Sequence, residues 1–154
     1  MRIELICIEK TKKIEYKNII QDYLKRINKK LKISVKEITF YIPKKGSSSI
    51  KPKNLIETGI NRYDYVVLLD ESGKNFSSKG FSRWLNSKIC SANIKCLKFV
   101  IGGPYGFNNE FKLKFNEKIS LSKMTFSHQM IRIFILEQIY RSLKIINNEP
   151  YHNE

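Results

Sequence analysis

The chain has 154 residues, of which 42% are hydrophobic, and its formal net charge is +15. This length suits one domain with a sizeable core, so a single domain over residues 1–154 is expected. There is no apolar run of about eighteen residues, as a transmembrane helix needs, and no signal-peptide pattern at the amino terminus. Three cysteines without metal-ligand spacing indicate neither a disulfide framework nor a zinc site. A cytoplasmic protein without a metal or a membrane partner is therefore expected.

The charge is distributed unevenly along the chain. Residues 10–53 hold fourteen basic and three acidic side chains, whereas residues 126–154 hold three of each. A basic face opposite a neutral, apolar terminal region suits a polyanion such as nucleic acid at one surface and packing at another. The alternative is a solvated lysine-rich face, and part of the lysine excess can reflect composition bias, because isoleucine and asparagine are also abundant.

In the first part of the chain, the pattern predicts a strand over residues 2–8, a helix over 12–31 and a strand over 33–42. A loop over 43–49 and a short helix over 52–60 follow. The predicted helix over 12–31 has lysines on one face and an apolar stripe on the other, made of Ile14, Ile19, Ile20, Tyr23, Leu24, Ile27 and Leu31.

The second part begins with a continuous apolar run over residues 64–70, which is typical of a strand buried on both faces. Ser77 or Ser78 is expected to cap a helix that reaches about Ala92, with Phe81, Trp84, Leu85 and Ile89 on one side. Further elements are a strand over 97–101, a helix over 108–115, a strand over 119–121 and a helix over 128–146. Alternating strands and helices predict an α/β fold with a mostly parallel sheet flanked by helices.

The last predicted helix is apolar around nearly its whole circumference. Such a helix is buried in a core or in an interface. A domain of this size has little room to enclose about five turns, so one face is expected to pack on the sheet and the other on a second subunit. The sequence therefore predicts a homodimer.

A glycine-rich segment follows the strand over 97–101 and reads Gly102-Gly-Pro-Tyr-Gly106. It matches neither the P-loop nor the dinucleotide-binding pattern. Glycines at the carboxyl end of a buried strand allow a ligand to approach the backbone, and ligands of parallel α/β sheets bind at that edge. A backbone-lined pocket is one reading of this segment, and a tight turn between two elements is the other.

Taken together, several segments closely resemble the RlmH family, also called YbeA-like proteins, over essentially the whole chain. In order they are Ile101-Gly-Gly-Pro-Tyr-Gly106, Leu121-Ser-Lys-Met-Thr-Phe126, His128-Gln-Met-Ile-Arg132, Glu137-Gln-Ile-Tyr-Arg141 and Pro150-Tyr-His152. Members of that family are 23S rRNA pseudouridine N3-methyltransferases of the SPOUT superfamily. The resemblance implies a homodimer and a SPOUT-type α/β knot, a deep trefoil knot in the C-terminal half.

The resemblance also implies that S-adenosyl-L-methionine binds in the knot, largely through backbone groups. The positions that match the family's contacts are Leu69, Gly103, Leu121, Ser122, Lys123, Met124, Thr125 and Phe126. An adenine ring needs an apolar slot with a few backbone donors and acceptors, which residues of these types can supply. Without the resemblance, the apolar members of this set read as ordinary core.

Candidates for the RNA side of the reaction lie toward the C-terminus. Glu137 and Arg141 are four residues apart on one helix face and can pair, either for catalysis or simply to order the helix. Tyr151 can stack on the target base, and His152 can assist removal of the N3 proton or hold a phosphate. His128 is a further possibility. Relatives often end in Tyr-His followed by a cation, whereas Asn153 follows here.

The sequence thus favours an S-adenosylmethionine-dependent methyltransferase whose substrate is 23S rRNA within the large subunit or the 70S ribosome. The alternative is a non-catalytic basic RNA-binding module of the same fold. The intact glycine segment and the intact 121–126 segment favour the enzyme.

Overall fold

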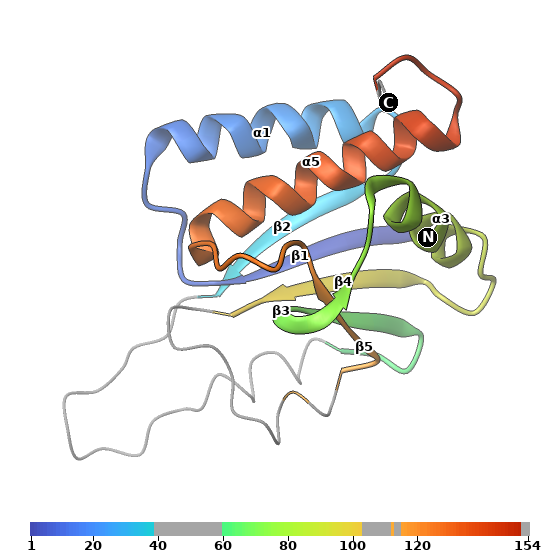
Figure 1. Ribbon diagram of the computed structural model, residues 1–154, viewed down its shortest axis with the longest axis horizontal. Helices are drawn as coiled ribbons and strands as arrows, with labels where there is room; N and C mark the ends of the chain where they lie inside the picture. The colour runs from blue at the N-terminus through green and yellow to red at the C-terminus, as the bar shows by residue number, and fades with distance from the viewer. Residues whose placement is uncertain (39–59, 103–111, 113–114, 152–154) are drawn as a thin grey trace.

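The computed structural model describes residues 1–38, 60–102, 112 and 115–151. Within them, five strands form one parallel sheet in the order β2-β1-β4-β3-β5 (Figure 1). The prediction of an α/β fold with a parallel sheet is confirmed. The strands are β1 (Arg2–Ile8), β2 (Ile33–Ile38), β3 (Asp64–Asn75), β4 (Cys96–Ile101) and β5 (Glu117–Ser120), and the helices are α1 (Ile14–Asn28), α3 (Ser78–Ile89) and α5 (His128–Ile146).

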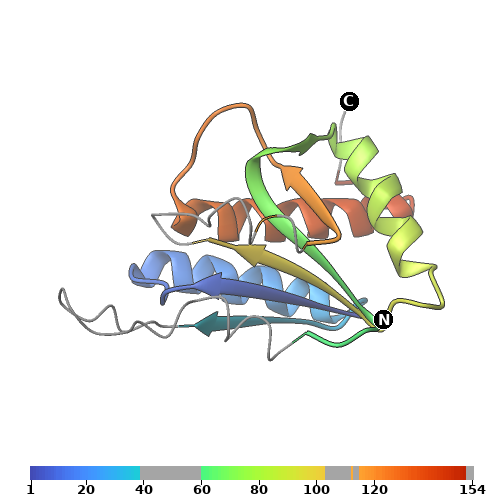
Figure 2. The same ribbon diagram turned by 90° about the horizontal axis from the view of Figure 1, so that it is seen from below.

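The three described helices pack on one face of the sheet (Figures 1 and 2). Successive strand residues point to opposite faces, so each central strand contributes to two apolar layers. In β1, Leu5 and Cys7 belong to the core beneath the helices, whereas Ile6 and Ile8 belong to a second cluster. The apolar run at the start of β3 divides in the same way, with Val67 on one side and Val66 and Leu68 on the other, as predicted for a strand buried on both faces.

Helix α1 has a narrower apolar stripe than predicted. Ile20 and Ile27 are buried, but Ile14 and Ile19 are 61% and 40% exposed. Ile19 is turned about 100° around the helix axis from Ile20, which takes it out of the face that contacts the core. The prediction that Ile14 and Ile19 join the stripe is therefore wrong.

Strand β3 is longer than the apolar run that predicted it. It continues past Asp70 because β5 pairs with its polar end, where Lys74 and Asn75 lie opposite Ile119 and Ser120 after a shift in register. Pairing with a neighbour thus overrides the low strand propensity of these residues. Strand β2 is described to Ile38. The loop predicted over 43–49, most of the helices predicted over 52–60 and 108–115, and the loop on which the predicted knot depends lie outside the described residues.

Two serines cap the helices that follow. The Ser77 Oγ accepts a hydrogen bond from the Gly80 N–H at the start of α3, and the Ser127 Oγ accepts one from the Met130 N–H at the start of α5. Each cap satisfies one of the free N–H groups in a first helical turn. The bounds predicted for the last helix are confirmed, whereas α3 ends at Ile89 rather than near Ala92.

Helix α5 crosses the sheet between α1 and α3 and contacts both (Figure 1). The α5 side chains of Ile135, Leu136 and Ile139 are fully buried in the core. Two polar residues of α5, Arg132 and Ser142, are buried as well, while the apolar Ile133 and Phe134 stay partly exposed. The neighbouring helices therefore cover the flanks of α5 within one chain and leave part of its apolar surface accessible. No helix of the described residues is long and apolar enough to cross a membrane.

Gly73 marks the closest approach of β3 to β5, and we predict that Gly73→Ala destabilises the fold. A Cβ at this position would lie 2.5 Å from the Ile119 N and 2.6 Å from the Lys118 carbonyl carbon. Because backbone atoms cannot move aside as a side chain does, the loss in unfolding free energy should reach about 2 kcal/mol or more.

Urea unfolding measures this loss, with Gly80→Ala as the matched control. A Cβ at Gly80 would meet the Ser77 Oγ at 3.2 Å, which is a side-chain atom. In a helix, alanine is favoured over glycine by about 1 kcal/mol. This gain offsets the tight contact with the Ser77 Oγ, so Gly80→Ala should be close to neutral. Equal losses in the two variants would contradict the steric account of Gly73.

Candidate active site

A cavity of about 610 Å³ opens at the carboxyl ends of β4 and β5, beside the middle of β3. Leu69 lines it from β3 and Gly102 from the end of β4, and His128 and Ile131 line it from the first turns of α5. This is the edge at which ligands bind to parallel α/β sheets, as the glycine segment predicts.

Most of the residues predicted to bind the cofactor meet in this cavity. Its walls include Leu69, Leu121, Ser122, Met124, Thr125 and Phe126. Lys123 is exposed and does not line the cavity. The side chain of Met124 is 71% exposed, so it lies at the open side of the cavity rather than in an enclosed slot. Gly103 lies outside the described residues.

Side-chain hydrogen bonds give the segment from Ser120 to Thr125 its shape. The Ser120 Oγ donates to the Ser122 carbonyl oxygen at 2.6 Å, and the Ser122 Oγ accepts from the Met124 N–H at 2.9 Å. The Thr125 hydroxyl donates to the Glu71 carboxylate at 3.2 Å. Short serine and threonine side chains favour such local turns. The segment is thus a hydrogen-bonded loop tied to the end of β3.

Two carboxylates and one ammonium lie at the wall of the cavity that β3 forms. The Lys112 Nζ lies 2.6 Å from the Asp70 Oδ2, and Glu71 is next to Asp70 in the cavity lining. Burial acts to raise the pKa of Asp70, but hydrogen bonds from Lys112 and Ser72 outweigh it, and the pKa is lowered. Asp70 is therefore ionised at neutral pH. The sequence analysis did not single out these acidic residues as site residues, although their position after the apolar run of β3 was a usable signal.

His128 joins this cavity rather than the C-terminal candidates. Its Nε2 lies 3.5 Å from the Glu9 Oε2. Burial and the nearby Arg132 guanidinium lower the pKa of His128, although Glu9 acts in the opposite direction. The imidazole is therefore mostly neutral at neutral pH and is able to accept a proton.

The remaining RNA-side candidates form a separate cluster toward the end of α5. The predicted pair is confirmed, because Arg141 Nη2 donates to Glu137 Oε1 at 2.7 Å and Nε donates to the same oxygen at 2.9 Å. The Arg141 guanidinium lies 5.1 Å from the ring centroid of Tyr151. Arg141 is thirteen positions after His128 on α5, which corresponds to a rise of roughly 20 Å along the helix axis. His152 lies outside the described residues.

Tyr151 is packed against its own chain. Its ring lies 4.8 Å from that of Tyr140 in an edge-to-face arrangement. Burial and a hydrogen bond with Tyr151 raise the pKa of Tyr23, on α1, to about 12. The start of the C-terminal tail is thus held between α1 and α5. A smaller cavity of about 290 Å³, lined by Phe126, Phe134 and Glu137 among others, lies between this cluster and the larger cavity.

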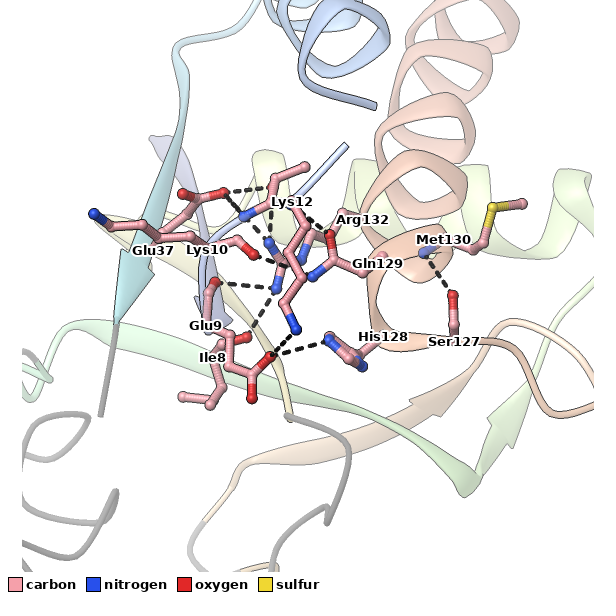
Figure 3. A network of polar contacts seen from close by, with 11 residues as sticks. Ile8, Glu9, Lys10, Lys12, Glu37, Ser127, His128, Gln129, Met130 and Arg132 are labelled. Carbon is pink, nitrogen blue, oxygen red and sulfur yellow. Dashed lines mark hydrogen bonds and ion pairs between the residues drawn. The ribbon is translucent and has the colours of Figure 1, made fainter. Parts of the chain in front are cut away.

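The sequence analysis also missed Arg132 as a structural centre of this region. The side chain is fully buried, and its guanidinium donates to the Ile8 carbonyl oxygen at 2.8 Å and to the Thr11 hydroxyl at 2.8 Å (Figure 3). These partners are more than 120 positions away in the sequence. The local signals were an arginine in an apolar helix and its place in the segment His128-Gln-Met-Ile-Arg132, neither of which indicates these partners.

The described residues hold no group of three or more histidine, cysteine, aspartate or glutamate side chains that is arranged to bind a metal ion. Cys7, Cys90 and Cys96 are free thiols, and burial raises the pKa of Cys7 to about 12.

Comparison with known proteins agrees with the architecture and extends over the whole chain. The family described as predicted SPOUT methyltransferase matches residues 1–152. A protein of Christiangramia forsetii named ribosomal RNA large subunit methyltransferase H is 45% identical over an alignment of 157 positions that covers 99% of each chain. Proteins with the same name from Flavobacterium johnsoniae and Parabacteroides distasonis are each 44% identical over an alignment of 158 positions that covers 100% of each chain.

Proposed function

The chain belongs to the SPOUT methyltransferase family, and from that membership we propose that it methylates N3 of a pseudouridine in 23S rRNA with S-adenosyl-L-methionine as the methyl donor. Its activity as an rRNA methyltransferase follows from full-length relatives at about 45% identity that carry this name. The donor, the base and the atom are the finer part of the proposal. We also propose that residues 1–154 act as one domain and contain the knot of the family.

The observation that carries the proposal is the meeting of the predicted cofactor segment with the carboxyl end of β4 and the middle of β3 in one cavity. Leu69, Leu121 and Phe126 offer apolar contacts for an adenine ring, and the backbone of residues 121–126 offers donors and acceptors. Asp70 and Glu71 add negative charge at the cavity wall. This charge suits a donor whose sulfonium is positive.

When bound, S-adenosylmethionine supplies an activated methyl group, so the protein needs no covalent intermediate. The residues of the chain have to hold the accepting nitrogen in line with the methyl group and to remove the N3 proton of the base. His128, neutral and at the cavity, is proposed to accept this proton. Glu137, Arg141, Tyr151 and His152 are proposed to bind and orient the RNA.

The separation of roughly 20 Å between His128 and Arg141 along α5 supports a dimer. One chain alone places its methyl-donor cavity and its Arg141–Tyr151 cluster far apart. The outer face of α5 carries Met130, Ile133 and Phe134, which are partly exposed. We propose that two chains pair through this face, so that the cluster of one chain completes the site of the other.

The basic region supports RNA as the partner. Lys12, Lys13, Lys17 and Lys29 are exposed along α1 and its preceding loop. Such a surface binds phosphate through a salt-dependent term that carries no sequence information. Large-subunit RNA, either free in the subunit or within the 70S ribosome, is the proposed substrate. A non-catalytic RNA-binding module would keep this surface, but the cavity and its hydrogen-bonded loop would have no role in it.

The central prediction is that the purified protein methylates large ribosomal subunits from a bacterial strain that lacks this activity. Transfer of a labelled methyl group from S-adenosylmethionine, followed by mass spectrometry of the digested RNA, identifies the nucleoside. We expect one 3-methylpseudouridine per subunit. A methylated uridine would correct the base, and binding without methyl transfer would favour the non-catalytic module.

A second prediction concerns the charge at the cavity. Glu71→Gln should weaken S-adenosylmethionine binding about fivefold, because an exposed charge pair contributes about 1 kcal/mol. Binding of S-adenosylhomocysteine, whose sulfur is uncharged, should change less than twofold. Calorimetric titration compares the two ligands. Thr125→Val removes the hydrogen bond to Glu71 but keeps its charge, so it should affect both ligands equally; the same pattern in Glu71→Gln would contradict a charge effect.

A third prediction concerns the assembly. Light scattering at micromolar concentration should give twice the chain mass of 18.2 kDa. Phe134→Glu should shift the protein toward the monomer, because it places a charge in the proposed interface. Ile19→Glu, at an exposed apolar position on α1, is the control and should remain dimeric. A wild-type monomer would rule out a site shared between two chains.

A further inference from the structure

The first turns of α5 contact two neighbouring parts of the molecule. His128 and Ile131 line the methyl-donor cavity. Gln129 and Arg132 contact the loop between β1 and α1, and His128 reaches the same loop at Glu9 (Figure 3). That loop, residues 9–13, is called the lysine loop here, because Lys10, Lys12 and Lys13 are all exposed on it. A single stretch of helix therefore touches both the cavity and a basic segment.

Gln129 holds the backbone of the lysine loop. Its Nε2 donates to the Lys10 carbonyl oxygen at 3.1 Å, and its Oε1 accepts from the Lys12 N–H at 3.1 Å. One amide group thus satisfies a donor and an acceptor of the main chain on either side of Thr11. These contacts fix the path of the loop, and the lysine side chains on it stay exposed.

Arg132 holds the same loop from beneath. Nη2 donates to the carbonyl oxygens of Ile8 and Glu9 at 2.8 and 3.1 Å, and Nη1 donates to Thr11 at 2.8 Å. Nη1 also lies 3.3 Å from the Glu37 carboxylate at the end of β2. Glu9 has a φ of 70°, a left-handed conformation that a non-glycine residue rarely adopts. The hydrogen bond to its carbonyl oxygen helps to hold that conformation.

A buried guanidinium contributes little net free energy to folding. Its desolvation offsets most of the gain from its partners, and an apolar side chain of similar volume often serves the fold as well. The neighbouring buried positions of α5, such as Ile135 and Leu136, are apolar. What Arg132 adds is a fixed geometry between the lysine loop, the end of β2 and the helix that lines the cavity.

We propose that the lysine loop binds phosphates of the rRNA beside the methyl-donor cavity, and that Gln129 and Arg132 are positioning residues that hold this contact at a fixed place relative to the cavity. The proposal rests on the proposed function. The chemistry of the partner follows from the loop, since three ammonium groups on a short segment match the spaced charges of a phosphate backbone. Only one of them, Lys12, has an ion pair within the described residues, with Glu9 at 3.9 Å.

Two kinds of variant separate charge from position. Replacing Lys10, Lys12 and Lys13 by glutamine removes phosphate contacts, so the dependence of the logarithm of subunit affinity on the logarithm of salt concentration should flatten by roughly 2. The effect on KM should exceed the effect on kcat. Gln129→Leu and Arg132→Lys leave the three lysines of the loop in place, but they remove hydrogen bonds that hold the loop backbone. Their salt dependence should match that of the wild type, while kcat falls about tenfold or more, because a misplaced substrate reacts slowly.

The assay uses full-length protein, large ribosomal subunits from a strain lacking the activity, and S-adenosylmethionine. Lys98→Met is the matched control for general damage. Lys98 is a buried cation of β4, with its Nζ 2.8 Å from Asp64 and 3.5 Å from Glu4. It belongs to neither the cavity lining nor the loop contacts. Its loss should lower the unfolding free energy without changing the salt dependence or the kcat of the folded fraction.

The results distinguish the proposals. A fall in kcat for Gln129→Leu that is no greater than for Lys98→Met would overturn the positioning role, and an unchanged salt dependence in the lysine variant would overturn the phosphate contact. Gln129 is only half-buried, so its variant is expected to fold even where Arg132→Lys does not. Absence of methyl transfer by the wild type would refute the proposed function instead, and the salt dependence of subunit binding would still decide whether the lysine loop contacts RNA.

Discussion

Parallel pairing of β3 with both β4 and β5 is the constraint on which the site depends. In this register the carboxyl ends of β4 and β5 lie beside Leu69 of β3, and Gly102 and the segment after β5 line one cavity there. The approach is close enough that Gly73 has backbone atoms of β5 where a side chain would begin. The position of Leu121 is therefore set by the main-chain pairing of β5, and side-chain hydrogen bonds shape the loop after it.

Helix α5 forms the other side of the site, and it has polar side chains that are buried and apolar side chains that are partly exposed. Arg132 and Ser142 are buried against the chain's own core, whereas Ile133 and Phe134 keep partly exposed apolar surface. Each reversal has a physical reason in the neighbours. The buried guanidinium donates to backbone carbonyl oxygens at the end of β1, and the partly exposed apolar side chains are the ones proposed to contact a second chain. One helix thereby supplies a wall of the cavity, a support for the basic loop and the proposed subunit interface.

Local signals were sufficient for the elements and for much of the pocket. The run of apolar residues predicted α5 with its observed bounds, and the resemblance over residues 121–126 located the segment that lines the cavity. Contacts between distant parts of the chain were beyond such signals. The extension of β3 past Asp70 depends on β5, the exposure of Ile19 depends on how α1 lies on the sheet, and the partners of Arg132 lie more than 90 positions away. Tyr151 was expected to face RNA, yet within one chain it packs against Tyr140.

The long reach of the α5 contacts has a consequence for synthesis of the protein. The lysine loop is made among the first residues of the chain, but the groups that fix it are made near the end, with Gln129 and Lys12 separated by 117 positions. Contacts of such sequence separation form late in folding, because the intervening chain has to be ordered first. A nascent chain that ends before α5 therefore carries its positive charge without the geometry for its use. The contacts of Gln129 and Arg132 with this loop therefore exist only in a chain that has been synthesised through α5.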